Sequence, residues 1–97
     1  MRLPECTESN SLLEGDLALA SQQQTIKEMT VLETETGYSV AVTLKWEPSK
    51  IWYLTTRRNR RAPKKVTDLS RLNKQLKQIA PDQGYLLLRN QTIPKSK

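Results

Sequence analysis

The chain has 97 residues, which gives room for one domain. Its apolar fraction of 36% is low for a globular domain, so we expect part of the chain to lie outside any core. Cys6 is the only cysteine, which excludes an internal disulfide, and histidine is absent. Since the commonest general base and metal ligand is missing, we expect no metal site, no cofactor and no enzymatic activity.

Positive charge is concentrated in the second half of the chain. Residues 1–47 carry three basic and eight acidic side chains, a net charge of −5, whereas residues 48–97 carry thirteen basic and two acidic ones, a net charge of +11. Such a field attracts polyanions. The sequence has no apolar run long enough to cross a bilayer, and its first residues lack the layout of a signal peptide, so we expect a cytoplasmic protein.

Residues 1–24 are predicted to form a flexible acidic arm. Polar residues dominate, and the glycine at position 15 weakens an apolar patch that would otherwise favour a helix, so only a transient helix is expected over 11–20. The arm's carboxylates have three possible roles: folding back on the basic half, contacting a protein partner, or keeping the arm soluble. They are Glu5, Glu8, Glu14 and Asp16.

Three strands are expected next. Residues 26–34 are rich in β-branched side chains, and residues 35–37 supply a turn in which Gly37 adopts a positive φ. Apolar and polar residues then alternate over 38–46, which is typical of a half-buried strand. Residues 47–50 are predicted to turn the chain into an antiparallel strand over 51–57.

The register of these last two strands has two alternatives. Pairing Trp46 with Trp52 buries both rings and turns Tyr53 outward. A shift by one residue places Ile51 and Tyr53 inside instead. Both alternatives stay open, and the first buries the larger apolar area.

A helix and a final strand complete the prediction. Thr67 or Asp68 can cap the helix, and Pro81 and Gly84 end it. Its apolar stripe is Leu69, Leu72, Leu76 and Ile79. A short strand follows over 85–89, and residues 91–97 are expected to be a frayed basic tail.

The predicted fold class is therefore α+β. One helix packs on a small, mainly antiparallel four-stranded sheet in a two-layer β-β-β-α-β arrangement, with a disordered N-terminal arm at 1–24 and the domain at 25–90. The last strand is expected to lie beside the first, in the order 4-1-2-3, and parallel in direction to the third.

The densest cationic stretch is the predicted loop over residues 57–65. Its candidate phosphate contacts are Arg57, Arg58, Arg60, Arg61, Lys64 and Lys65. Guanidinium groups present a planar fork of donors to phosphate oxygens. The exposed face of the helix is expected to extend this set with Arg71, Lys74 and Lys77, and an outward Tyr53 with Lys45 would supply contacts on the sheet.

The run Ile51–Arg58, continued by Pro63-Lys64 and by Asp68–Leu72, resembles small accessory DNA-binding proteins of plasmids and integrated phage elements. Three strands followed by a helix are also similar to the arm-type DNA-binding domains of tyrosine recombinases. The resemblance covers residues 38–80 and implies a sheet and arginines that contact DNA. The chain departs from the recombinases by its final strand and by having no catalytic domain.

The sequence therefore predicts a non-enzymatic nucleic-acid-binding protein, with DNA favoured over RNA and no membrane association. The alternative is a small protein-interaction or inhibitory module that docks on an acidic protein partner.

Overall fold

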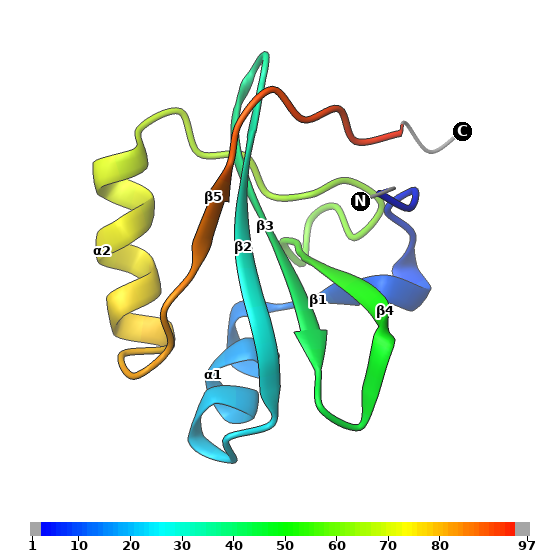
Figure 1. Cartoon of the computed structure of the whole chain (residues 1–97). Helices are drawn as coiled ribbons and strands as arrows, with labels where there is room; N and C mark the ends of the chain where they lie inside the picture. Colours follow the sequence, from blue (N-terminus) through cyan, green and yellow to red (C-terminus); the bar gives the residue numbers. More distant parts are fainter. Residues whose placement is uncertain (1–2, 95–97) are drawn as a thin grey trace.

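A five-stranded mixed sheet runs through the middle of the molecule in the order β1-β4-β3-β2-β5 (Figure 1). The structure is a computed structural model, and it describes residues 3–94. The strands are β1 (Ser11–Leu12), β2 (Ile26–Thr34), β3 (Gly37–Leu44), β4 (Glu47–Leu54) and β5 (Leu86–Leu88). The helical elements are a 3-10 turn (Glu8–Asn10), α1 (Glu14–Gln22) and α2 (Leu69–Ile79).

The α+β class is confirmed, and the strand count is corrected. Strand β5 pairs with β2 in parallel, while β2, β3 and β4 form an antiparallel meander, as expected for the last strand beside the first. The predicted set of four strands and one helix is wrong, because β1 adds a fifth strand and α1 a second helix.

The expected disordered N-terminal arm is the source of that error. Strand β1 pairs in parallel with the end of β4, and Leu17 of α1 is fully buried. The side chain of Asn10 closes the preceding turn by accepting from the Thr7 amide (2.8 Å) and donating to the Glu5 carbonyl (2.9 Å). A few well-placed apolar side chains and one buried amide therefore order this polar segment. Residue 24 does not separate a disordered arm from a folded domain.

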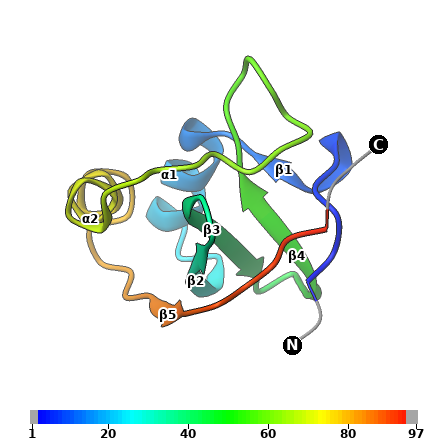
Figure 2. The same ribbon diagram turned by 90° about the horizontal axis from the view of Figure 1, so that it is seen from above.

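The helix-side core lies between the sheet and the two helices (Figure 2). Helix α2 contributes Leu72 and Leu76, with Leu69 and Ile79 packed at its margin, which confirms the predicted stripe. The carboxylate of Asp68 accepts from the Ser70 amide at 2.9 Å and caps the helix, as expected.

The opposite face of the sheet is also covered, by the N-terminal and C-terminal segments (Figure 2). This second-face core consists of Leu3, Cys6, Leu32, Ala41 and Tyr53, with Ile51, Leu88 and Ile93 packed against it. Burial on both faces differs from the expected one-sided sheet. It explains why β2 carries a continuous buried run from Met29 to Leu32.

Neither expected register of β3 and β4 is observed, although Val42, Leu44 and Leu54 share the helix-side core, as the Trp46–Trp52 alternative expects. The turn falls at residues 45–46, so that Val42 pairs with Trp52 and Ala41 with Tyr53. Trp46 is consequently 64% exposed. Tyr53 lies on the face opposite the helices, as the Trp46–Trp52 alternative expects, but this face is covered by Leu3 and Cys6, so Tyr53 is buried in the second-face core. Pro48 is tolerated inside β4 because β1 pairs only with Tyr53 and Leu54, which leaves the first part of β4 as an edge.

The C-terminal segment is held on the sheet as far as it is described. The amide of Gln91 donates to the Glu33 carbonyl at 2.9 Å, and Ile93 packs on the second-face core. The predicted frayed tail at 91–97 therefore differs from the structure over residues 91–94, and residues 95–97 lie outside the described range. Between residues 3 and 94, neither helix is long and apolar enough to cross a membrane.

Gly37 has the expected positive φ, at +145°, and a Cβ at this position would lie 2.8 Å from the Val66 carbonyl oxygen. We expect Gly37→Ala to lower the free energy of unfolding by at least about 2 kcal/mol, through backbone strain and this clash. Urea denaturation measures the difference. Gly15→Ala is the control, because its Cβ meets nothing within 4 Å and alanine favours a helix. Equal effects of the two substitutions would contradict this explanation.

Candidate nucleic-acid interface

The basic loop, residues 55–68 between β4 and α2, is anchored at both ends. Thr55 donates its amide to the Leu12 carbonyl at 2.8 Å, and Lys64 donates its amide to the Leu54 carbonyl at 2.8 Å. Val66 then pairs with Tyr38 through two backbone hydrogen bonds of 2.8 and 3.0 Å. The stretch between these anchors projects beyond the sheet (Figure 2).

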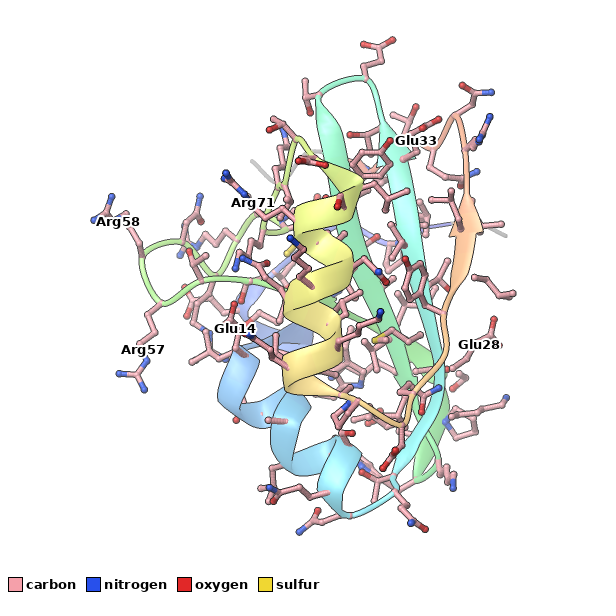
Figure 3. All side chains as sticks on the ribbon, turned by 90° about the vertical axis from the view of Figure 1, so that its left-hand side faces the viewer. Glu14, Glu28, Glu33, Arg57, Arg58 and Arg71 are labelled. Atoms are coloured by element: carbon pink, nitrogen blue, oxygen red, sulfur yellow. The ribbon has the colours of Figure 1, made fainter. Side chains whose placement is uncertain are left out.

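Arg57 and Arg58 lie at the outer end of this loop and are exposed. Their side chains point away from the body of the molecule (Figure 3). Neither forms an ion pair with any residue between 3 and 94. Their guanidinium groups are therefore available to an anionic partner.

Other cations of the loop are engaged by the N-terminal segment. Nε of Arg61 lies 3.2 Å from Oε1 of Glu8, and Nζ of Lys64 lies 2.7 Å from Oε1 of Glu14. Arg60 donates from Nε to the hydroxyl of Ser11 at 2.9 Å. Of the possible roles of the acidic residues, the structure thus places Glu8 and Glu14 on the basic loop. The Arg61–Glu8 pair is exposed on both sides and contributes about 0–1 kcal/mol, so a polyanion can displace it, whereas the Lys64 side chain is only 22% exposed.

Helix α2 continues the cationic surface only in part. Nζ of Lys64 lies 3.5 Å from Oε1 of Gln75, which brings the loop against the helix. Arg71 lies on the loop-facing side of α2 (Figure 3). Lys74 follows it on the exposed face, whereas Lys77 is rotated about 120° from Arg71 around the helix axis. The structure therefore groups Arg71 and Lys74 with the loop and places Lys77 apart.

The two predicted sheet contacts do not join the loop: the outward position expected for Tyr53 is wrong, and Lys45 lies at a distance. Tyr53 is fully buried, and its hydroxyl donates to the Pro4 carbonyl at 2.7 Å, so its ring cannot stack on a base. Lys45 is exposed in the turn before β4, whereas the basic loop begins after the end of β4. The two are separated by the length of an eight-residue strand, about 25 Å.

The cationic residues also divide between two sides of the loop. Residues 64–66 alternate as in a strand, so that Lys64 faces the helices and Lys65 lines a pocket on the second face of the sheet, together with Arg61. No spacing in the sequence indicates this pocket, because four separate segments build it. The outer end of the loop thus carries the protruding Arg57 and Arg58, and its returning part lines the pocket.

At the far end of the sheet, Trp46 is exposed beside Trp52, which is half-buried and packs against the helix-side core. The rings of Trp46 and Trp52 lie 6.1 Å apart, and Nζ of Lys50 lies 3.9 Å from the centre of the Trp52 ring. Both tryptophans were expected in the core. Only the position of the turn decides that Trp46 is outside.

Burial suppresses ionisation in the second-face core. It raises the pKa of the Cys6 thiol from its ordinary 9.0 to about 11, so at neutral pH the sulfur is not a nucleophilic thiolate. Burial, and secondarily the nearby Cys6, raises the pKa of Tyr53 from 10.0 to about 12. Over residues 3–94, no three acidic or cysteine side chains gather as a metal-binding group.

Comparison with known proteins gives no further assignment: no family model, no curated protein and no solved structure matches this chain.

The pKa values of Cys6 and Tyr53 predict loss of stability in alkali. Between about pH 9 and 12 the unfolded chain releases these protons while the folded chain retains them, so the free energy of unfolding falls as the pH rises. We expect the midpoint of thermal unfolding, followed by circular dichroism, to fall through this range. Cys6→Ala should flatten the lower part of the profile. A wild-type profile that is level up to pH 11 would contradict the burial of both groups.

Proposed function

We propose that this protein binds nucleic acid, with DNA favoured over RNA, and that it acts by binding alone. The observation that carries the proposal is the pair Arg57 and Arg58, exposed at the tip of an anchored loop and free of ion pairs within residues 3–94. Arginines in this setting form bidentate hydrogen bonds with phosphate oxygens or with the major-groove edge of guanine.

The surroundings of the tip support the same proposal. Arg60, Arg61, Lys64 and Lys65 share the loop, and Arg71 and Lys74 adjoin it on α2. A polyanion that reaches the tip would therefore meet further cations on either side. Each phosphate neutralised in this way adds about 0.9 to the slope of log affinity against log salt.

The anchoring of the loop also favours binding. Because Thr55, Lys64 and Val66 are hydrogen-bonded to the sheet through their backbones, the tip is less free to move than an unanchored loop of the same length. Association then costs less conformational entropy. The charge of this surface would set both the rate of encounter and the affinity.

The carboxylates of Glu8 and Glu14 would act as internal competitors. They occupy Arg61 and Lys64 in the free protein, and a phosphate backbone would have to replace them. These two ion pairs would lower the nonspecific attraction of the loop for polyanions, while Arg57 and Arg58 stay accessible.

A second candidate function is docking on an acidic protein partner, through the basic loop or through the exposed tryptophan. Trp46 is 64% exposed beside Trp52, and tryptophan is enriched among the residues that dominate protein interfaces. Pull-down from nuclease-treated lysate separates the two functions, since a protein partner survives the loss of nucleic acid.

Removal of the tip arginines tests the proposal directly. We expect Arg57→Gln/Arg58→Gln to weaken binding to a short duplex by about tenfold or more at low salt, and to reduce the salt slope by about 2. Fluorescence anisotropy at several salt concentrations measures both quantities. Lys27→Gln/Lys45→Gln removes the same charge from exposed positions outside the basic loop and should change affinity by about twofold or less. Equal losses in the two variants, or no binding of the wild type at low salt, would contradict the proposal.

Removal of the competing carboxylates should have the opposite effect. We expect Glu8→Gln/Glu14→Gln to strengthen duplex binding by about three- to tenfold at low salt, because Arg61 and Lys64 are released. The matched control is Glu28→Gln/Glu47→Gln, which changes the net charge equally outside the loop; Glu28 lies across the molecule from it (Figure 3). The same anisotropy titration compares them. A gain of the same size in the control would show that only net charge matters.

A further inference from the structure

A pocket of about 620 Å³ opens on the second face of the sheet, behind the basic loop. Its walls come from the N-terminal segment at Cys6, the β2–β3 turn, the loop itself and the C-terminal segment at residues 91–94. Figure 1 shows this last segment crossing from β5 toward the N-terminal side of the molecule. We propose that the pocket binds a phosphate monoester carried on a compact, partly apolar group, with a nucleoside monophosphate as its simplest form.

The first observation is a buried hydroxyl group. Ser39 is only 1% exposed, and its Oγ has no hydrogen-bond partner among residues 3–94. Ser39 pairs with Leu32, a member of the second-face core, so its side chain belongs to the same face and lines the pocket. A buried hydroxyl without a partner destabilises a fold, and a ligand in the pocket would supply the missing hydrogen bond.

The second observation is the charge of the lining. The lining includes two cationic residues, Lys65 and Arg61, and one acidic residue, Glu35, which leaves a positive balance. The ion pair of Arg61 with Glu8 uses only Nε of the guanidinium. A phosphate monoester carries a charge of about −1.5 to −2 near neutral pH, which suits two cations better than a carboxylate or a phosphodiester does.

The third observation is an apolar wall beside these charges. It consists of Ala62, Pro63, Ile93 and Pro94. Inorganic phosphate would leave this wall unused, whereas a sugar or a base would cover it. The volume also lies within the range of small-molecule sites, about 300–1,000 Å³.

Two sources of this chemistry fit the pocket: a free mononucleotide, or the phosphorylated 5′ end of a nucleic-acid strand. The second source rests on the proposed function, and the first does not. Both would place the phosphate between Lys65 and Arg61.

Calorimetric titration with adenosine monophosphate, adenosine and inorganic phosphate tests the inference. We expect the monophosphate to bind at least about tenfold more tightly than adenosine or phosphate alone. Lys65→Gln should weaken this binding by about tenfold. Lys27→Gln is the control, since it removes a charge from an exposed position outside both the pocket and the basic loop, and its effect should be about twofold or less.

Ser39→Ala separates a ligand contact from a structural role. We expect it to weaken binding of the monophosphate by about fivefold while the melting temperature of the free protein is unchanged or raised. A large fall in melting temperature would show that the hydroxyl already has a partner in the fold, and would overturn its assignment to the ligand.

The source of the phosphate is found by competition. A short strand with a 5′ phosphate that displaces the monophosphate better than the same strand with a 5′ hydroxyl identifies a nucleic-acid end, and equal displacement identifies a free ligand. Absence of monophosphate binding at millimolar concentration, or equal binding of adenosine, overturns the inference. Duplex binding that persists in that case leaves the proposed function intact, and monophosphate binding without duplex binding contradicts only the proposed function.

Discussion

The backbone pairing of residues 64–66 with the sheet is the contact on which the rest of the site depends. Val66 exchanges two hydrogen bonds with Tyr38, and Lys64 donates to Leu54, so the returning arm of the loop extends the sheet between the end of β4 and the start of β3. Gly37 lies against the carbonyl group of Val66, which leaves no room for a side chain at position 37. These backbone hydrogen bonds hold Arg57 and Arg58 outside the sheet and place the side chains of Lys64 and Lys65 on opposite faces.

Charge is distributed differently in space than in the sequence. The acidic first half and the basic second half are not separate bodies, because β1 joins β4 and brings Glu8 and Glu14 against the loop. These ion pairs partly neutralise the base of the loop, while Arg57 and Arg58 form no ion pair with any residue between 3 and 94. Glu8 and Glu14 as weak competitors, together with the exposed Arg57 and Arg58, are compatible with nucleic-acid binding that weakens as the salt concentration rises.

Much of the second half of the fold follows from local patterns in the sequence. The leucine stripe and the Asp68 cap predict α2, and the turn before Gly37 follows from the need for a positive φ. The errors have a common cause: each depends on a long-range contact. The segment before residue 24 is ordered by β4, and Tyr53 is buried because that same N-terminal segment covers the face of the sheet on which Tyr53 lies. Alternation of apolar and polar residues indicates a strand, but it does not show that other segments cover both faces of the sheet.

The candidate site was predicted to a similar extent. The loop residues were found from their density of charge, which survives folding because charged side chains remain at the surface. The pocket, the ion pairs with Glu8 and Glu14, and the distance of Lys45 from the loop all depend on three-dimensional placement. The most direct measurement is the shift of individual amides during titration with a short duplex at low salt. Binding at the loop predicts the largest shifts at residues 57–61 and smaller ones at Arg71 and Lys74. Shifts confined to the β3–β4 turn, or absent throughout, would contradict it.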